Sequence, residues 1–211
     1  MGGLAGLADI VVECAPASVL SAIAEPALRA GRSVVVLSCG ALLERLDLID
    51  LARAHGGRIL VPTGALLGLD AVAAAAEGTI HSVRMTTRKP PGGLAGAPHL
   101  VRHGISVEGL KEALLVFKGT AREAARGFPA NVNVAAALSL AGIGADRTTI
   151  SIWADPAVTR NIHRIEVDAD SARFSLQIEN VPSENSRTGR ITALSVIALL
   201  RKLRSPLAVG T

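Results

Sequence analysis

Short apolar segments alternate with amphipathic ones through the first third of the chain. Residues 8–15, 34–38 and 59–61 are aliphatic and β-branched runs, which are typical of strands buried on both faces. Residues 18–30 and 42–55 place apolar side chains at helical spacing, and each stretch ends at glycine. Strands and helices that alternate in this way predict right-handed βαβ units in a parallel sheet, as in the later part of a Rossmann-like domain.

The pattern changes at residue 79. We predict a strand with polar alternation over 79–87 and a Pro/Gly-rich loop from Lys89 to about Gly104. The elements predicted after this loop are strands at 114–117, 148–154, 163–168 and 173–179, and helices at 121–126, 133–141 and 188–204.

Two domains and a closing helix follow from this order of elements. The fold class is α/β, with an incomplete Rossmann-like parallel sheet over residues 1–78. Residues 79–188 are expected to form an α+β domain with a mixed, mainly antiparallel sheet. Residues 189–211 are expected to form a C-terminal helix that packs back on the nucleotide-binding domain.

No dinucleotide-binding fingerprint precedes the first predicted strand. A Rossmann fold normally opens with a strand, a G-x-G-x-x-G turn and a helix whose N-terminus holds the pyrophosphate. The glycines between Gly2 and Gly6 have no strand before them. We therefore expect a late start codon or a real truncation, and we expect the 211-residue chain to bind NADH weakly or not at all.

Composition and charge exclude several classes of protein. The net charge of +4 comes from 22 basic and 18 acidic residues that are dispersed along the chain, and aromatic content is 2%, so we expect no nucleic-acid partner. No apolar run reaches membrane-spanning length, and no secretory signal is recognisable, so we expect a cytoplasmic protein without a membrane partner. Cys14 and Cys39 lie in apolar runs without a second ligand at metal spacing, which predicts buried thiols and no metal site.

Small and turn-forming residues follow each of the three predicted parallel strands. These are Cys14-Ala15-Pro16, Ser38-Cys39-Gly40 and Pro62-Thr63-Gly64-Ala65. In an open parallel sheet the ligand lies beyond the carboxyl ends of the strands, and small residues let it approach the backbone. We therefore expect these segments to line a nucleotide-binding crevice.

Two polar segments of the second domain contain the densest candidate chemistry. Asn131 and Asn133 stand at a predicted helix start, where Asn131 favours a capping role and Asn133 has less local reason to be polar. His163 follows a turn that contains Asn161, and imidazole is the natural proton carrier near neutral pH. From the residues alone, a purely structural role for His163 is favoured, and a catalytic role stays open.

Several of these strings together resemble the L-aspartate dehydrogenase family, from about Ala8 to about Arg204. The strings are FPANVNVAAALSLAGIG, ADP, RNIHRI, LSCGAL, VPTGALLGLD, TTRKPPGGL and IENVPSEN. The resemblance implies hydride transfer from Cα of L-aspartate to NAD or NADP, giving iminoaspartate, which hydrolyses to oxaloacetate and ammonia or feeds pyridine-nucleotide synthesis. It also implies a homodimer.

The same resemblance assigns roles to individual residues. His163 matches the family's active-site histidine, which would act as a general base with only a small pKa shift. Ala65 and Asn133 match positions that contact the cofactor.

A substrate with two carboxylates needs cationic or amide donors. Lys89, Arg160 and Arg164 neighbour the motifs, and solvation at the surface is the simpler role for any one of them. Lys89 is the preferred candidate because the two prolines after it bend its loop. Asn161 is a second candidate, although orienting the turn before His163 is its simpler role.

Two other functions remain open at this point. A truncated paralogue that serves as a binding or oligomerising protein would retain the second domain but hold a dinucleotide poorly. A dehydrogenase of the same fold could act on a related substrate such as homoserine. An in-frame strand-glycine-helix segment upstream of Met1 would favour the aspartate dehydrogenase reading over the paralogue.

Overall fold

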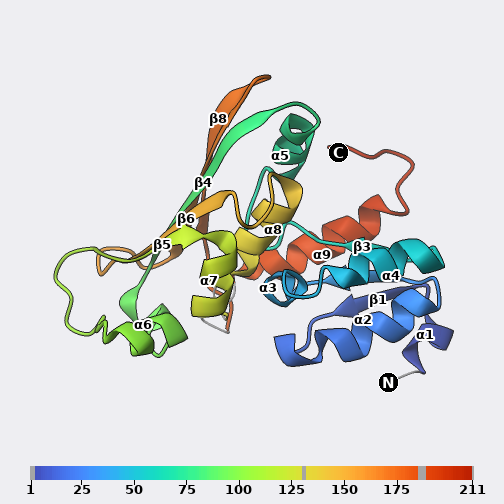
Figure 1. Cartoon of the computed structure of the whole chain (residues 1–211), viewed down its shortest axis with the longest axis horizontal. Helices are drawn as coiled ribbons and strands as arrows, with labels where there is room; N and C mark the ends of the chain where they lie inside the picture. Colours follow the sequence, from blue (N-terminus) through green and yellow to red (C-terminus); the bar gives the residue numbers. More distant parts are fainter. Residues whose placement is uncertain (1–2, 130–131, 185–188, 211) are drawn as a thin grey trace. The chain divides into compact units, whose positions relative to one another are not determined.

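The computed structural model describes residues 3–129, 132–184 and 189–210. The chain divides into two compact units, Met1–Pro62 and Thr63–Thr211, which we call unit 1 and unit 2 (Figure 1). The domain boundaries expected after residues 78 and 188 stay predictions. No helix in the described part of the chain is long and apolar enough to cross a membrane.

Unit 1 is a small parallel sheet with helices, as the alternating pattern predicted. Its strands pair in the order β1-β2-β3, and both pairings are parallel. The strands are β1 (Ile10–Glu13), β2 (Ser33–Val36) and β3 (Arg58–Leu60), and the helices are α1 (Leu4–Leu7), η1 (Ala17–Val19), α2 (Leu20–Arg29), α3 (Cys39–Leu42) and α4 (Asp47–His55). Residues 34–36 of the central strand are fully buried, which explains their aliphatic composition.

Two expectations for unit 1 were wrong. The single helix predicted over 42–55 is two helices, and the chain turns between them at Arg45, whose guanidinium binds the carboxylates of Asp47 and Glu25. Cys39 is buried as expected, but Cys14 is exposed because it follows the last residue of β1 and has already left the sheet. A hydrophobic run therefore did not distinguish the buried strand from the open turn behind it.

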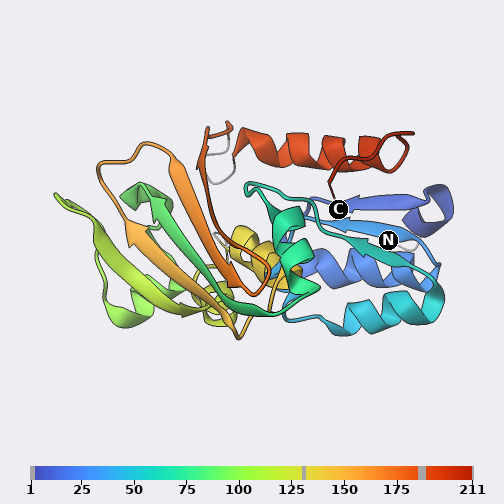
Figure 2. The same cartoon turned by 90° about the horizontal axis from the view of Figure 1, so that it is seen from above.

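Unit 2 contains the mixed, mainly antiparallel sheet that was expected. Its order is β5-β6-β4-β7-β8, with β4 parallel to β6 and the other three pairings antiparallel. The strands are β4 (Ile80–Lys89), β5 (Leu114–Thr120), β6 (Thr148–Ala154), β7 (Asn161–Ala169) and β8 (Arg173–Asn180). Figure 2 shows these strands twisting relative to one another.

The helices of unit 2 include three that the sequence pattern did not predict. These are α5 (Leu69–Ala76), the short helix η2 (Pro91–Gly93) and α6 (Pro98–His103); the others are α7 (Ala121–Gly127), α8 (Asn133–Ala141) and α9 (Arg190–Lys202). The helix α6 lies inside the predicted loop and begins with Pro98, which suits a first helical position. The expected packing of the C-terminal helix on the nucleotide-binding domain stays a prediction.

The two faces of the five-stranded sheet differ in burial. Along β4 and β7 buried residues alternate with more exposed ones, because successive side chains of a strand point to opposite faces. Figure 1 shows α5, α7 and α8 grouped along one side of the sheet, and both α7 and α8 contact β6. We call this side the covered face; the other side is the open face.

Candidate active site

A buried histidine and a buried lysine share the covered face at one end of the sheet. Strand register places His163 directly opposite Thr87, and their Nδ1 and Oγ1 atoms are hydrogen-bonded at 3.1 Å. Lys89 stands two residues beyond Thr87 on the same face of β4. His163 is 2% exposed and Lys89 is 4% exposed, and Lys89 is the one buried lysine or arginine among the residues that the structure describes.

Burial shifts the pKa values of both groups downward. Desolvation lowers the pKa of Lys89 from 10.5 to about 8. Desolvation, and after it the positive charge of Lys89, lowers the pKa of His163 from 6.5 to about 3. The expected small shift for His163 was therefore wrong, and its imidazole is neutral at physiological pH.

Lys89 is also held differently from the expectation. It is the last residue of β4 rather than part of a proline-bent loop, and it is not solvated. Its carbonyl oxygen accepts a hydrogen bond of 2.8 Å from the backbone N–H of Asp155. The carboxylate of Asp155 in turn binds the guanidinium of Arg88 at 2.8 Å, and this ion pair lowers the pKa of Asp155. Asp155 thus holds the end of β4 through both its backbone and its side chain.

Two side chains distant in sequence hold the turn that contains Ala65. The Nδ2 group of Asn180 donates to the carbonyl oxygen of Ala65 at 2.9 Å, and the backbone N–H of Gly64 donates to Oγ of Ser195 at 3.1 Å. Asn180 is also the ladder partner of Asn161, two residues before His163. The structure therefore connects the Ala65 turn to the strand end that carries His163.

This turn fits the approach of a nicotinamide nucleotide. The backbone φ of Gly64 is +63°, and in the described part of the chain no heavy atom beyond its two neighbours lies within 4 Å of where a Cβ would stand, so a ligand can come close to the backbone. Asn180 is 3% exposed, and among the described residues its buried Oδ1 atom has no hydrogen-bond partner.

The other predicted site residues are placed less centrally. Asn133 is the exposed first residue of α8, a helix that contacts β6, whereas Asn131 lies outside the described residues. Asn161 is the half-buried first residue of β7. Arg160 and Arg164 are exposed, and Arg164 pairs with Glu166 at 3.2 Å on the open face, away from His163.

The carboxyl ends of the strands of unit 1 also contain a polar group that the sequence reasoning missed. Glu13, the last residue of β1, is fully buried and accepts hydrogen bonds from the segments that follow β1 and β2. A charged residue inside an apolar strand was the available signal for it. Thr87, Asn180 and Ser195 were also missed, although Thr87 lies in the quoted string TTRKPPGGL and Asn180 in IENVPSEN. Nothing local in the sequence marks Ser195.

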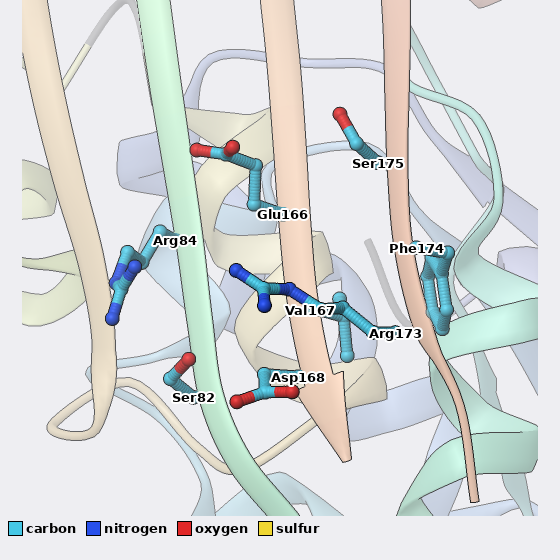
Figure 3. Close-up of a pocket in the computed structure, with 8 residues that line it drawn as sticks. All are labelled: Ser82, Arg84, Glu166, Val167, Asp168, Arg173, Phe174 and Ser175. Atoms are coloured by element: carbon cyan, nitrogen blue, oxygen red, sulfur yellow. The ribbon is translucent and has the colours of Figure 1, made fainter.

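A pocket of about 260 Å³ lies on the open face, formed by residues from β4, β7 and β8 (Figure 3). Arg84 stands opposite Glu166, and Asp168 stands opposite Arg173 in the strand register. Figure 3 shows these charged side chains projecting from neighbouring strands. Because this pocket is on the other side of the sheet from His163, we do not assign it to the same site.

Comparison with known families agrees with the division of the chain. Residues 3–62 match the NAD-binding domain of homoserine dehydrogenase, and residues 70–203 match the C-terminal domain of aspartate dehydrogenase. A parallel nucleotide-binding unit and a mixed sheet with a buried histidine and lysine define the class: the protein is a dehydrogenase that uses a nicotinamide nucleotide.

Individual relatives specify the family. The chain is 69% identical to the L-aspartate dehydrogenase of Bradyrhizobium diazoefficiens over 97% of this chain and 73% of that protein. It is 47% identical to the L-aspartate dehydrogenase of Methanosarcina mazei over 96% of this chain and 76% of that protein. The crystal structure of aspartate dehydrogenase from Thermotoga maritima superposes with a TM-score of 0.78, at 27% identity, over 95% of this chain and 78% of that chain. The chain belongs to the L-aspartate dehydrogenase family.

Proposed function

We propose that this protein oxidises L-aspartate to iminoaspartate, which hydrolyses to oxaloacetate and ammonia, with NAD or NADP as the hydride acceptor. The observation that carries the proposal is the buried pair of His163 and Lys89 on one face of the sheet. A neutral base and a desolvated cation side by side match what a zwitterionic dicarboxylate requires: one group to take a proton and one to bind an anion. The names of the relatives support the choice of aspartate.

His163 would be the general base. When bound, the nicotinamide ring supplies the acceptor for the hydride that leaves Cα. Substrate carboxylates bound beside the imidazole would raise its pKa again, and the ring would then take a proton from the substrate amine or from the water that attacks the imine. The hydrogen bond between Thr87 and Nδ1 orients the ring, so that Nε2 is the nitrogen left for this proton.

Lys89 would bind a substrate carboxylate. In the buried environment an ion pair between the ammonium and a carboxylate is screened far less than at the surface. An anionic ligand would also favour the charged form of Lys89 and so reverse part of the lowering of its pKa. Asn161 is the second candidate for the substrate, and Ala65 and Asn133 are the candidate cofactor contacts.

We also propose a homodimer that works in the cytoplasm. The open face of the unit 2 sheet presents both signs of charge, including Arg84, Glu166, Asp168 and Arg173, and could pair with a second copy. The thiols of Cys14 and Cys39 are both free, which suits a reducing compartment. The iminoaspartate produced could enter pyridine-nucleotide synthesis.

The direct test is substrate-dependent reduction of the cofactor, followed by absorbance of the reduced nicotinamide. We expect turnover with L-aspartate and little with L-homoserine, and parallel assays with NAD and NADP identify the preferred nucleotide. His163→Ala should lower kcat by about 100-fold or more and change cofactor affinity little. His81→Ala, which removes an exposed histidine from the same sheet, is the matched control. Equal small losses in kcat and cofactor affinity for His163→Ala would refute the catalytic role.

A further inference from the structure

Glu13 occupies an unusual position for a carboxylate. It ends β1, the strand at the edge of the parallel sheet of unit 1, and its exposure is 0%. Burial of an ionised carboxylate is unfavourable unless hydrogen bonds replace the water that it loses. The structure supplies those bonds entirely from neutral donors.

Four donors surround the two oxygens of this carboxylate. Oε1 accepts from the backbone N–H of Ala15 and from Oγ of Ser38, both at 3.0 Å. Oε2 accepts from the backbone N–H of Ser38 at 2.9 Å and of Leu37 at 3.2 Å. One donor follows β1 and three follow β2, so a single side chain ties together the two segments beyond these strands.

The tied segments are those at which an open parallel sheet binds its ligand. Residues 14–16 and 38–40 follow the carboxyl ends of neighbouring strands, and backbone there must hold one conformation for a dinucleotide to contact it. Without the carboxylate, three backbone N–H groups would lose an acceptor. The two segments would then be joined by longer hydrogen bonds, from Ser38 Oγ to the Ala15 carbonyl oxygen at 3.4 Å and from Leu37 N–H to the Glu13 carbonyl oxygen at 3.3 Å.

We infer that Glu13 is a positioning residue for the cofactor: it fixes the segments after β1 and β2 in the conformation that the dinucleotide meets, without touching the dinucleotide itself. The inference rests on the proposed function insofar as unit 1 binds the nicotinamide nucleotide. It adds a residue whose loss weakens cofactor binding through the backbone of Ala15 and Ser38.

Two substitutions separate the contributions of the donors. In Glu13→Gln, the amide oxygen can still accept from Leu37 and Ser38, and the NH₂ group can donate to Oγ of Ser38. The N–H of Ala15 then faces an NH₂ group and has no acceptor. In Glu13→Ala all four donors lose the carboxylate. Asp9→Asn is the matched control, because it removes an exposed carboxylate just before the other end of β1.

The experiment combines amide hydrogen exchange with an NMR titration of the whole chain by NAD⁺ up to millimolar concentration. For Glu13→Gln we expect about tenfold faster exchange at Ala15, little change at Ser38, and about tenfold weaker NAD⁺ binding. Asp9→Asn should change none of these. If Glu13→Ala does not fold, Glu13→Gln and Ser38→Ala, which removes one donor, provide the same comparison.

Three results would overturn the inference, and the first two leave the proposed function standing. If Glu13→Gln frees the Ala15 amide but binds NAD⁺ as the wild type does, then Glu13 only stabilises the fold, and the proposed function stands. If NAD⁺ shifts resonances of the wild type but none in residues 14–16 or 38–40, the cofactor lies elsewhere. Absence of any NAD⁺-dependent shift in the wild type would overturn the inference, because Glu13 would then position no cofactor, and would agree with the expected weak binding of the nucleotide.

Discussion

Replacing Lys89 by methionine should stabilise the protein and inactivate it. Methionine has a similar length, but no charge to desolvate. The fall in the pKa of Lys89 from 10.5 to about 8 is equivalent to about 3 kcal/mol, at about 1.4 kcal/mol per pH unit. The free energy of unfolding of Lys89→Met at pH 7 should therefore exceed that of the wild type by up to about 3 kcal/mol.

The pH dependence of this difference provides the sharper test. Below pH 8 the lysine is charged in both the folded and the unfolded chain, so the folded wild type bears the whole desolvation penalty. Between about 8 and 10.5 the unfolded chain binds more protons than the folded chain, so the stability of the wild type rises with pH. The advantage of Lys89→Met should thus shrink through this window and vanish above it.

Urea denaturation followed by circular dichroism at pH 7 and pH 10.5 measures both quantities. Lys118→Met, an exposed position in β5, is the control and should change stability by less than about 0.5 kcal/mol. Lys89→Met should also lose turnover of L-aspartate, because the substrate carboxylate loses its cation. The reasoning from desolvation would be refuted if Lys89→Met were less stable than the wild type at pH 7. It would also be refuted if the variant were more stable than the wild type by the same amount at both pH values.

Three further predictions concern individual side chains. Thr87→Val removes the hydroxyl that is hydrogen-bonded to His163. Steady-state kinetics should show about tenfold lower kcat with an unchanged KM for the cofactor. A raised KM with normal kcat would contradict an orienting role. Ser195→Ala removes the acceptor for Gly64 N–H and should raise the cofactor KM more than it lowers kcat, whereas an effect on kcat alone would count against it. Because burial, and after it the charge of Glu13, raises the pKa of Cys39 to about 12, a thiol reagent at pH 8 should modify exposed Cys14 in the native protein and Cys39 only after unfolding.

Local pattern was sufficient for most of the fold. Apolar runs and side-chain spacing predicted all three strands of unit 1 and the positions of the strands of unit 2 along the chain, because these patterns are local properties of the sequence. The split between α3 and α4 was missed because the chain turns at Arg45. The guanidinium of Arg45 pairs with Glu25, a distant residue on α2, and with Asp47. The helix α6 was missed because its Pro/Gly-rich stretch indicated a loop, and no element was predicted for the residues of α5.

For the candidate site, the sequence predicted residues but not the environment around them. Motif strings alone pointed to His163, Lys89 and Ala65, and the family that they implied is confirmed by the relatives. Their environment was not readable from those strings. The pKa of His163 was expected to shift little, and Lys89 was expected in a loop, because desolvation depends on what packs around a group and not on its neighbours in sequence.

By itself, then, the sequence determined the strands and most of the longer helices, the family and the side chains capable of acid–base chemistry. Only the tertiary structure decided which of these side chains meet. Thr87 and His163 are 76 residues apart, Gly64 and Ser195 are 131 apart, and strand register or helix docking brings each pair within hydrogen-bonding distance. Such pairings arise from long-range contacts that no local period encodes, and burial at those contacts is what leaves His163 neutral beside a charged Lys89.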